Sequence, residues 1–153
     1  MSITIYGIKN CSTMKKAFDK LTVLGLEYEF FDYKKQAIGK PILAHWVETV
    51  GIDKIMNTKG TTYRNLSDTQ KAQIKQDVHA ALDMMVAKPS MIKRPIVVSD
   101  NELIIGFDEI AFEKLAKWKT KQVKRDKEKS IANKKASNKT RFFNWRVKII
   151  LPR

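Results

Sequence analysis

The chain has 153 residues and a mass of 17.7 kDa, which suits one compact domain. Apolar residues make up 43% and charged residues 30%, so the chain can form a core, and no apolar run is long enough to span a membrane. The net charge of +14 is uneven: residues 1–118 hold 17 Lys/Arg and 14 Asp/Glu, whereas residues 119–153 hold 13 and 2. The excess charge therefore belongs to a C-terminal extension, and the pI of 9.9 does not by itself indicate a nucleic-acid-binding protein.

The N-terminal part predicts a β-α-β unit. Residues 2–6 (SITIY) alternate in polarity and favour a strand. Apolar residues at helical spacing then predict a helix from residue 11 or 12 to about residue 24, ended by Gly25. Residues 27–33 (EYEFFDY) predict a second strand, which the crossover places parallel to the first.

The middle of the chain predicts a helical insert. Pro41 suits the first turn of a helix that ends near residue 50, and a short helical turn follows at residues 53–56. Residues 57–64 (NTKGTTYR) are typical of a loop. Ser67 and Gln70 then form a capping-box pattern, which opens a helix that continues, with one break left open, to about residue 85.

The C-terminal part of the body predicts a hairpin and a final helix. Residues 93–99 (KRPIVVS) and 102–106 (ELIIG) favour two strands joined by a turn, and Asp108 caps a helix through about residue 118. The complete order predicts an α/β protein of thioredoxin-like fold, β-α-β then β-β-α with a helical insert, over residues 1–118. Residues 119–153 form a basic extension of unknown role, which we expect to be poorly ordered because Lys, Ser and Asn dominate its first part.

Cys11 is the only cysteine, and it lies where the first strand meets the first helix. Free N–H groups and the helix dipole favour an anion there, and Lys9, Lys15 and Lys16 add positive potential, so we expect a lowered thiol pKa. The alternative is that Cys11 is merely a small buried apolar residue. Since no second cysteine exists, any disulfide of Cys11 joins it to an external thiol, for which glutathione or a glutaredoxin is the natural partner. One cysteine and two histidines also argue against a metal site.

Four segments in the same order resemble the ArsC/Spx family, most closely its YffB-like branch: residues 6–17 (YGIKNCSTMKKA), 60–66 (GTTYRNL), 93–97 (KRPIV) and 106–107. The resemblance covers residues 1 to about 118, and the extension has no counterpart in it. It implies a thioredoxin-like fold with a helical insert, in agreement with the order of elements. It also implies that Pro95 follows a cis peptide bond and faces Cys11.

The resemblance assigns roles to particular residues. In the arsenate reductases of this family a cysteine attacks the oxyanion, three arginines hold it, and glutathione with glutaredoxin resolves the product. Cys11 matches the nucleophile and Arg64 and Arg94 match two of the arginines, but Phe107 stands where the third would be. Gly7 replaces a histidine of those enzymes. Because Phe cannot bind an oxyanion as a guanidinium does, efficient arsenate reduction is not expected.

The function implied is therefore a glutathione-dependent thiol–disulfide oxidoreductase in the cytoplasm, with glutathione as co-substrate. Asn10, Lys9, Lys15, Arg64, Arg94 and Pro95 are the candidate substrate-binding residues. Two alternatives remain: an Spx-like adaptor that binds RNA polymerase without a redox switch, since Met14 replaces the second cysteine of the Spx pair, and a weak arsenate reductase. Neither a membrane partner nor nucleic acid is expected, apart from nonspecific contact by the basic extension.

Overall fold

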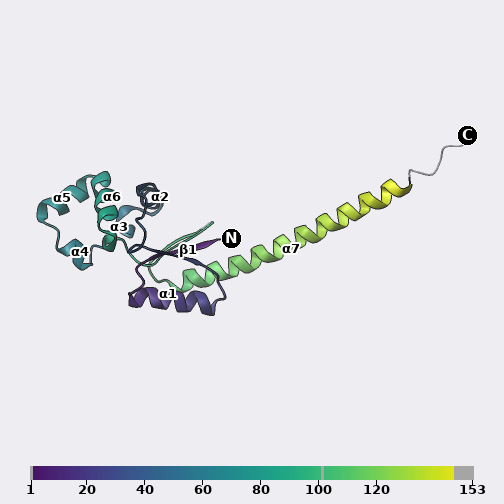
Figure 1. Ribbon diagram of the computed structural model, residues 1–153, viewed down its shortest axis with the longest axis horizontal. Helices are drawn as coiled ribbons and strands as arrows, with labels where there is room; N and C mark the ends of the chain where they lie inside the picture. Colours follow the sequence, from purple (N-terminus) through teal and green to yellow (C-terminus); the bar gives the residue numbers. More distant parts are fainter. Residues whose placement is uncertain (1, 101, 147–153) are drawn as a thin grey trace, which may run out of the picture. The chain divides into compact units, whose positions relative to one another are not determined.

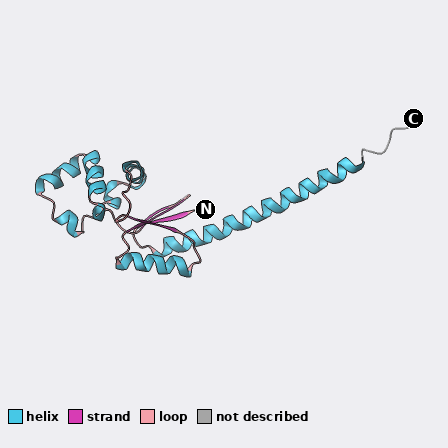
Figure 2. Cartoon of the chain, in the orientation of Figure 1, coloured by secondary structure: helices cyan, strands magenta, loops and turns pink. Residues whose placement is uncertain are grey.

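The computed structural model describes residues 2–100 and 102–146. The chain divides into a first compact unit, residues 1–113, and a second unit from residue 114 onward. No helix in the described ranges is long and apolar enough to cross a membrane. The elements, labelled in Figure 1 and coloured by type in Figure 2, are β1 (Ile3–Gly7), α1 (Ser12–Val23), β2 (Glu29–Asp32), α2 (Lys40–Val50), α3 (Ile52–Ile55), α4 (Thr61–Arg64), α5 (Asp68–Gln76), α6 (Val78–Ala87), the 3-10 turn η1 (Pro89–Met91), β3 (Ile96–Ser99), β4 (Leu103–Ile105) and α7 (Glu109–Arg146).

The four strands form one mixed sheet in the order β2-β1-β3-β4. β1 and β2 are parallel, with Gly7 opposite Asp32, whereas β1 and β3 are antiparallel, with Tyr6 opposite Ile96. β3 and β4 form the predicted hairpin. In this register the end of β1, the end of β2 and the start of β3 lie at one edge of the sheet. That edge carries the candidate site.

Helix α1 covers one face of the sheet (Figure 1). Met14, Ala17 and Leu21 on its inner side are fully buried, as the helical spacing predicted. Lys20 of α1 forms two ion pairs with the start of α7. Its ammonium group lies 3.0 Å from a carboxylate oxygen of Glu109 and 2.9 Å from one of Glu113. The buried apolar side is what seats α1 on the sheet, because exposed ion pairs such as these contribute little to stability.

The helices between β2 and β3 form the predicted insert, in which α2 packs against the sheet and α5 packs against α6 (Figure 1). Trp46 of α2 meets Tyr6 of β1 edge-on, with ring centroids 4.8 Å apart. The capping box is confirmed, since the Ser67 hydroxyl accepts from the Gln70 amide at 3.2 Å and the Gln70 side chain accepts from the Ser67 amide at 3.1 Å. The sequence left open whether the helix that follows is broken. It is broken at Asp77, between α5 and α6, where the Asp77 side chain caps α6 by accepting a hydrogen bond from the His79 amide.

Two expectations about secondary structure were wrong. The segment 57–64, expected to be a loop, contains the short helix α4 at its end. The final helix begins as predicted, with Asp108 accepting from the Ala111 amide at 3.1 Å, but it continues to Arg146 instead of ending near residue 118. The reason is local: residues 109–146 contain neither glycine nor proline, so no residue in this stretch ends the helix.

Candidate functional site

Cys11 is the N-cap residue of α1, with extended backbone torsions (φ −144°, ψ 130°). Its carbonyl accepts the first hydrogen bond of the helix, from the Lys15 amide at 3.0 Å. The side chain is partly exposed. A thiol held here faces the free N–H groups of the first helical turn and remains accessible to a substrate.

The surroundings of Cys11 favour the thiolate. Burial on its own raises the pKa of the thiol, but hydrogen bonding from the backbone N–H groups of Met14 and Thr13, together with the Thr13 hydroxyl and the positive charge of Arg94, outweighs it. The pKa of Cys11 is therefore lower than that of an ordinary cysteine. The N–H groups that favour the thiolate belong to the first turn of α1, where the helix dipole also favours an anion.

Arg94 and Pro95 come to the site from the opposite direction, just before β3. Their peptide bond is cis, as the resemblance implied. Pro95 is buried and its carbonyl accepts from the Gly106 amide at 2.7 Å, which holds this segment to the sheet, while Arg94 is partly exposed. Because β3 runs antiparallel to β1, the residues that precede β3 lie beside those that follow β1. The guanidinium of Arg94 is thereby near enough to the sulfur to lower its pKa.

None of the other predicted substrate-binding residues is among the groups that lower the pKa of Cys11. Arg64 is the last residue of α4 and is exposed; α4 itself contacts the η1 turn that leads to Arg94. Asn10, Lys9 and Lys15 are exposed beside Cys11. The contribution of these four residues to substrate binding stays a prediction.

Tyr33 belongs to this edge of the sheet and was missed by the sequence analysis. It directly follows β2, its amide donates to the Gly7 carbonyl at 2.9 Å, and its side chain is only 5% exposed. Its hydroxyl is buried and makes no hydrogen bond with the described residues. Burial raises the pKa of Tyr33 far above its usual value, with a smaller opposing effect from Arg94, so the side chain is a neutral phenol at all physiological pH values. The parallel pairing of the first two strands was the signal that could have found it.

Phe107 lies in the loop between β4 and α7, at the position where the arsenate reductases of the resemblance carry their third arginine. It packs against the buried Phe112, with ring centroids 5.6 Å apart. An apolar contact with the body thus occupies this position. Among the described residues, no cluster of three or more His, Cys, Asp or Glu side chains is arranged to hold a metal ion.

Comparison with known proteins identifies the family. The family model described as "ArsC family" matches residues 6–115, which include Cys11, Arg64, Arg94 and Pro95. The chain belongs to the ArsC family. The resemblance seen in the motifs is thus confirmed, and so is the thioredoxin-like fold of its members.

Solved structures and sequence relatives agree with the ArsC assignment. The structure of a protein named YFFB is 38% identical, with a TM-score of 0.70, and the match covers 74% of this chain and 97% of that one. An arsenate reductase (ArsC) related protein from Brucella melitensis is 41% identical, with a TM-score of 0.60, and covers 74% and 93%. The regulatory protein MgsR of Bacillus subtilis is 29% identical over 77% of this chain and 93% of its own length. The ArsC family therefore includes both reductase-like and regulatory relatives of this chain.

Proposed function

We propose that the protein is a glutathione-dependent thiol–disulfide oxidoreductase with Cys11 as its single nucleophile. The observation that carries the proposal is the lowered pKa of Cys11 at the N-cap of α1, beside Arg94 and the buried Pro95. A thiolate is the form of cysteine that attacks disulfides, and its fraction at neutral pH rises as the pKa falls toward ambient pH. Such chemistry requires a reducing compartment with glutathione, for which we propose the cytoplasm.

The reaction needs two exchanges, because the chain has one cysteine. The Cys11 thiolate attacks the glutathione sulfur of a mixed disulfide, R–S–S–G; the S–S bond breaks, and the released R thiolate takes a proton from water. Cys11 now carries glutathione. The thiolate of a second glutathione attacks that glutathione sulfur, which releases oxidised glutathione and restores the Cys11 thiolate. Over the two exchanges the sulfur of R is reduced from a disulfide to a thiol, and the sulfur of the second glutathione is oxidised from a thiol to a disulfide, while the first glutathione sulfur remains in a disulfide throughout.

Arg94, and Arg64 on α4, supply guanidinium groups for the carboxylates of glutathione. Arg94 has a second role in this scheme, since its charge also stabilises the thiolate. The N–H groups of the first turn of α1 stabilise the negative charge on the sulfur both before attack and when it leaves in the second exchange.

The test is turnover of a glutathionylated peptide by the purified protein with reduced glutathione. We expect saturable release of the peptide thiol, with Cys11→Ser inactive and Ser12→Ala, the exposed neighbour at the start of α1, fully active. A wild-type rate no greater than that of glutathione alone would refute the proposal. Arsenate is the second substrate to assay, and we expect it to be reduced slowly at best, because Phe107 packs on Phe112 and supplies no guanidinium.

An adaptor that binds RNA polymerase is the second candidate, and it is favoured by the similarity to MgsR, a protein named as regulatory. In this chain Met14 stands three residues after Cys11 and is fully buried, so an adaptor function would not be switched by an internal disulfide. Purified RNA polymerase should then bind wild type and Cys11→Ser equally. Equal binding without thiol turnover would favour the adaptor over the enzyme.

A further inference from the structure

Six cations lie on the chain segments that meet at the end of the sheet where Cys11 lies. Lys9 follows β1, Lys34 and Lys35 follow β2, Lys15 and Lys16 lie in the first turns of α1, and Arg94 precedes β3. We call them the basic rim: Lys9, Lys15, Lys16, Lys34, Lys35 and Arg94. All five lysines are exposed, and none of the six takes part in an ion pair with the described residues.

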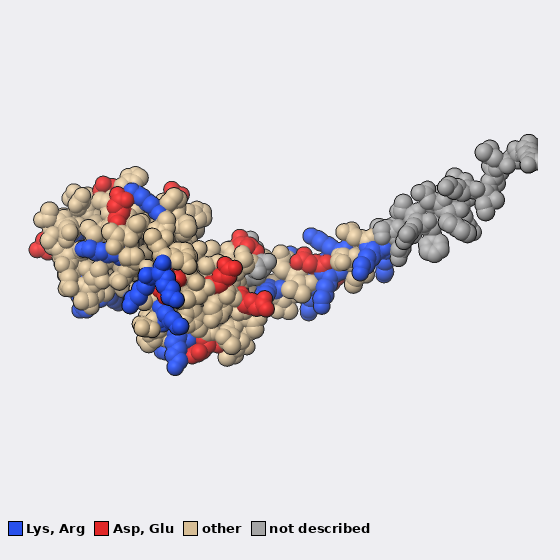
Figure 3. All heavy atoms as spheres, viewed as in Figure 1, with Lys and Arg blue, Asp and Glu red and all other residues tan. Residues whose placement is uncertain are grey.

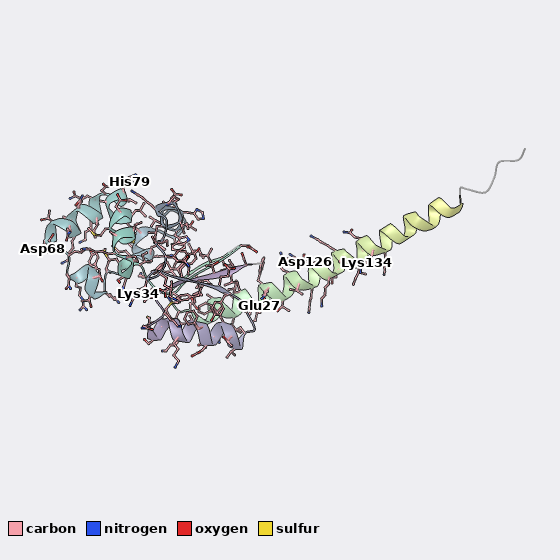
Figure 4. All side chains as sticks on the ribbon, viewed as in Figure 1. Glu27, Lys34, Asp68, His79, Asp126 and Lys134 are labelled. Atoms are coloured by element: carbon pink, nitrogen blue, oxygen red, sulfur yellow. The ribbon has the colours of Figure 1, made fainter. Side chains whose placement is uncertain are left out.

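The topology brings the rim together although its members are up to 85 positions apart in the sequence. Gly7 pairs with Asp32, so the chain segments that continue from β1 and β2 emerge next to each other. Helix α1 begins at the same edge, and Figure 4 shows Lys34 at the end of the sheet where α1 starts. The Asp32 residue at the end of β2 is buried, and its carboxylate accepts a hydrogen bond from the Lys34 amide at 3.0 Å.

The rest of the body has the opposite charge. Residues 1–118 hold 17 basic and 14 acidic residues, so removing the six rim residues leaves 11 basic against 14 acidic. Figure 3 shows a band of Lys and Arg side chains over the region where α1 begins, with smaller groups of Asp and Glu beside it and on the rest of the visible face. Charge segregated in this way draws an anionic partner to one face and orients it.

Glutathione alone does not account for this surface. It carries two carboxylates and one ammonium group, which the arginines of the proposed function already match. Five additional exposed lysines suit a larger anion. A nucleic acid offers phosphates but no sulfur for the nucleophile that the lysines surround, whereas an acidic protein segment offers both negative charge and a reactive disulfide.

Resting on the proposed function, we propose that the basic rim docks an acidic protein segment that carries the glutathionylated cysteine attacked by Cys11. The partner is recognised by its carboxylates on both sides of the modified cysteine, and the lysines on the two strand ends and on α1 meet them from either side of the sulfur. The reaction is the exchange described above, in which the acidic protein leaves as the free thiol.

The turnover test uses three glutathionylated peptides that differ only in the residues flanking the cysteine: glutamate, glutamine or lysine. At about 20 mM salt we expect kcat/KM for the glutamate peptide to exceed that for the glutamine peptide about tenfold, and the lysine peptide to be the poorest. At about 1 M salt the three values should converge, because the screening length falls to about 3 Å. Equal values at low salt would overturn the proposal.

Charge reversal identifies the surface. Lys34→Glu/Lys35→Glu should reduce the ratio of kcat/KM for the glutamate peptide over the glutamine peptide to near one. Lys71→Glu/Lys75→Glu, which makes the same change of charge on α5 in the insert, should leave that ratio as in wild type. Urea midpoints of both variants establish that they are folded. If the control lowers the ratio as much as the rim variant, net charge rather than the rim is responsible and the proposal fails.

A binding experiment without catalysis distinguishes failure of the docking surface from failure of the proposed oxidoreductase activity. Cys11→Ser protein is titrated with the same peptides carrying serine in place of the modified cysteine, with fluorescence anisotropy as the readout. If Cys11→Ser protein binds the glutamate peptide preferentially but wild-type protein turns over none of the peptides, the docking surface is supported and the oxidoreductase is refuted. Turnover without any preference supports the oxidoreductase and refutes the docking surface. A random-sequence duplex DNA that displaces the glutamate peptide at equal charge concentration would show the partner to be nucleic acid, against the proposal.

Discussion

Met14 lies directly against Gly7, the last residue of β1. A Cβ atom added at Gly7 would lie 2.7 Å from the Met14 Cε atom and closer still to the thioether sulfur. The Met14 side chain, which is fully buried, therefore fills the space that a side chain at residue 7 would take. The start of α1, and with it the Cys11 sulfur, is held close to the sheet by this contact. The histidine that arsenate reductases carry at this position could not enter without displacing Met14.

Gly7→Ala is expected to destabilise the fold by about 1–3 kcal/mol through overpacking. Met14→Ala alone should cost about 2–5 kcal/mol through the cavity it leaves. The double variant should lose less unfolding free energy than the two single variants together, because the cavity left by Met14→Ala accommodates the added methyl group of Gly7→Ala. Urea unfolding of the four proteins measures the coupling, and additive losses would contradict the contact.

Arg94→Gln is expected to raise the pKa of Cys11, because one of the causes that lowers it is the guanidinium charge. The rate of alkylation by iodoacetamide against pH gives the pKa directly, and the curve should move toward the free-thiol value of about 8.5. Arg64→Gln, the matched loss of an arginine, should leave the curve nearly unchanged. A wild-type curve already at the free-thiol value would remove the physical basis of the proposed function.

The same shift predicts the sign of a pH effect on stability. Because the pKa of Cys11 is lower in the folded protein than in the unfolded chain, the thiolate favours folding. This contribution is fully present above the unfolded pKa and is lost as the pH falls through the folded pKa. The difference in unfolding free energy between wild type and Cys11→Ser should therefore shift in favour of wild type as the pH rises through that window, and the opposite trend would contradict the shift.

Tyr33→Phe is expected to leave stability unchanged or to raise it by up to about 1 kcal/mol. The hydroxyl is buried without a hydrogen-bond partner among the described residues, so its removal ends a desolvation cost and breaks no bond. Tyr33→Ala is the contrasting variant, which should cost about 3–5 kcal/mol because the ring is part of the core. A loss of more than about 1 kcal/mol in Tyr33→Phe would show that the hydroxyl is hydrogen-bonded in solution.

Local sequence signals predicted the elements well where each signal acts within a few residues. Gly25 ends α1 with a positive φ of 64°, and Ser67 with Gln70 forms the expected capping box, because such signals depend only on the neighbouring backbone. The predicted end of the last helix near residue 118 was wrong, because the change to Lys-rich composition marks a change of charge, whereas a helix ends at a residue that cannot continue it.

The site was predictable only in part. Cys11 was found from its place before a helix, but its neighbours depend on strand pairing. Tyr33 and Lys34 become neighbours of the Cys11 loop only through the parallel register of β1 with β2, which alternation in sequence does not specify. The packing of Phe107 on Phe112 likewise results from tertiary contact and had no local signal.

The segment of α7 after residue 118 is expected to contribute nothing to the stability of the body. Residues 119–135 hold eight Lys/Arg and two Asp/Glu, distributed around the helix, and their large apolar members Val123 and Ile131 are 47% and 55% exposed. A chain ending at Trp118 should therefore unfold at the same urea concentration as the full chain. The helix of the extension should be marginal at low salt, because like charges at i,i+4 spacing repel and residues 119–135, whose side chains the structure describes, present no buried face that compensates. The difference in circular dichroism at 222 nm between the two chains should then grow as salt rises from about 10 mM to about 0.5 M, while the shorter chain shows no such change. A lower midpoint for the shorter chain would instead show that the extension stabilises the body, against the domain boundary expected from the charge distribution.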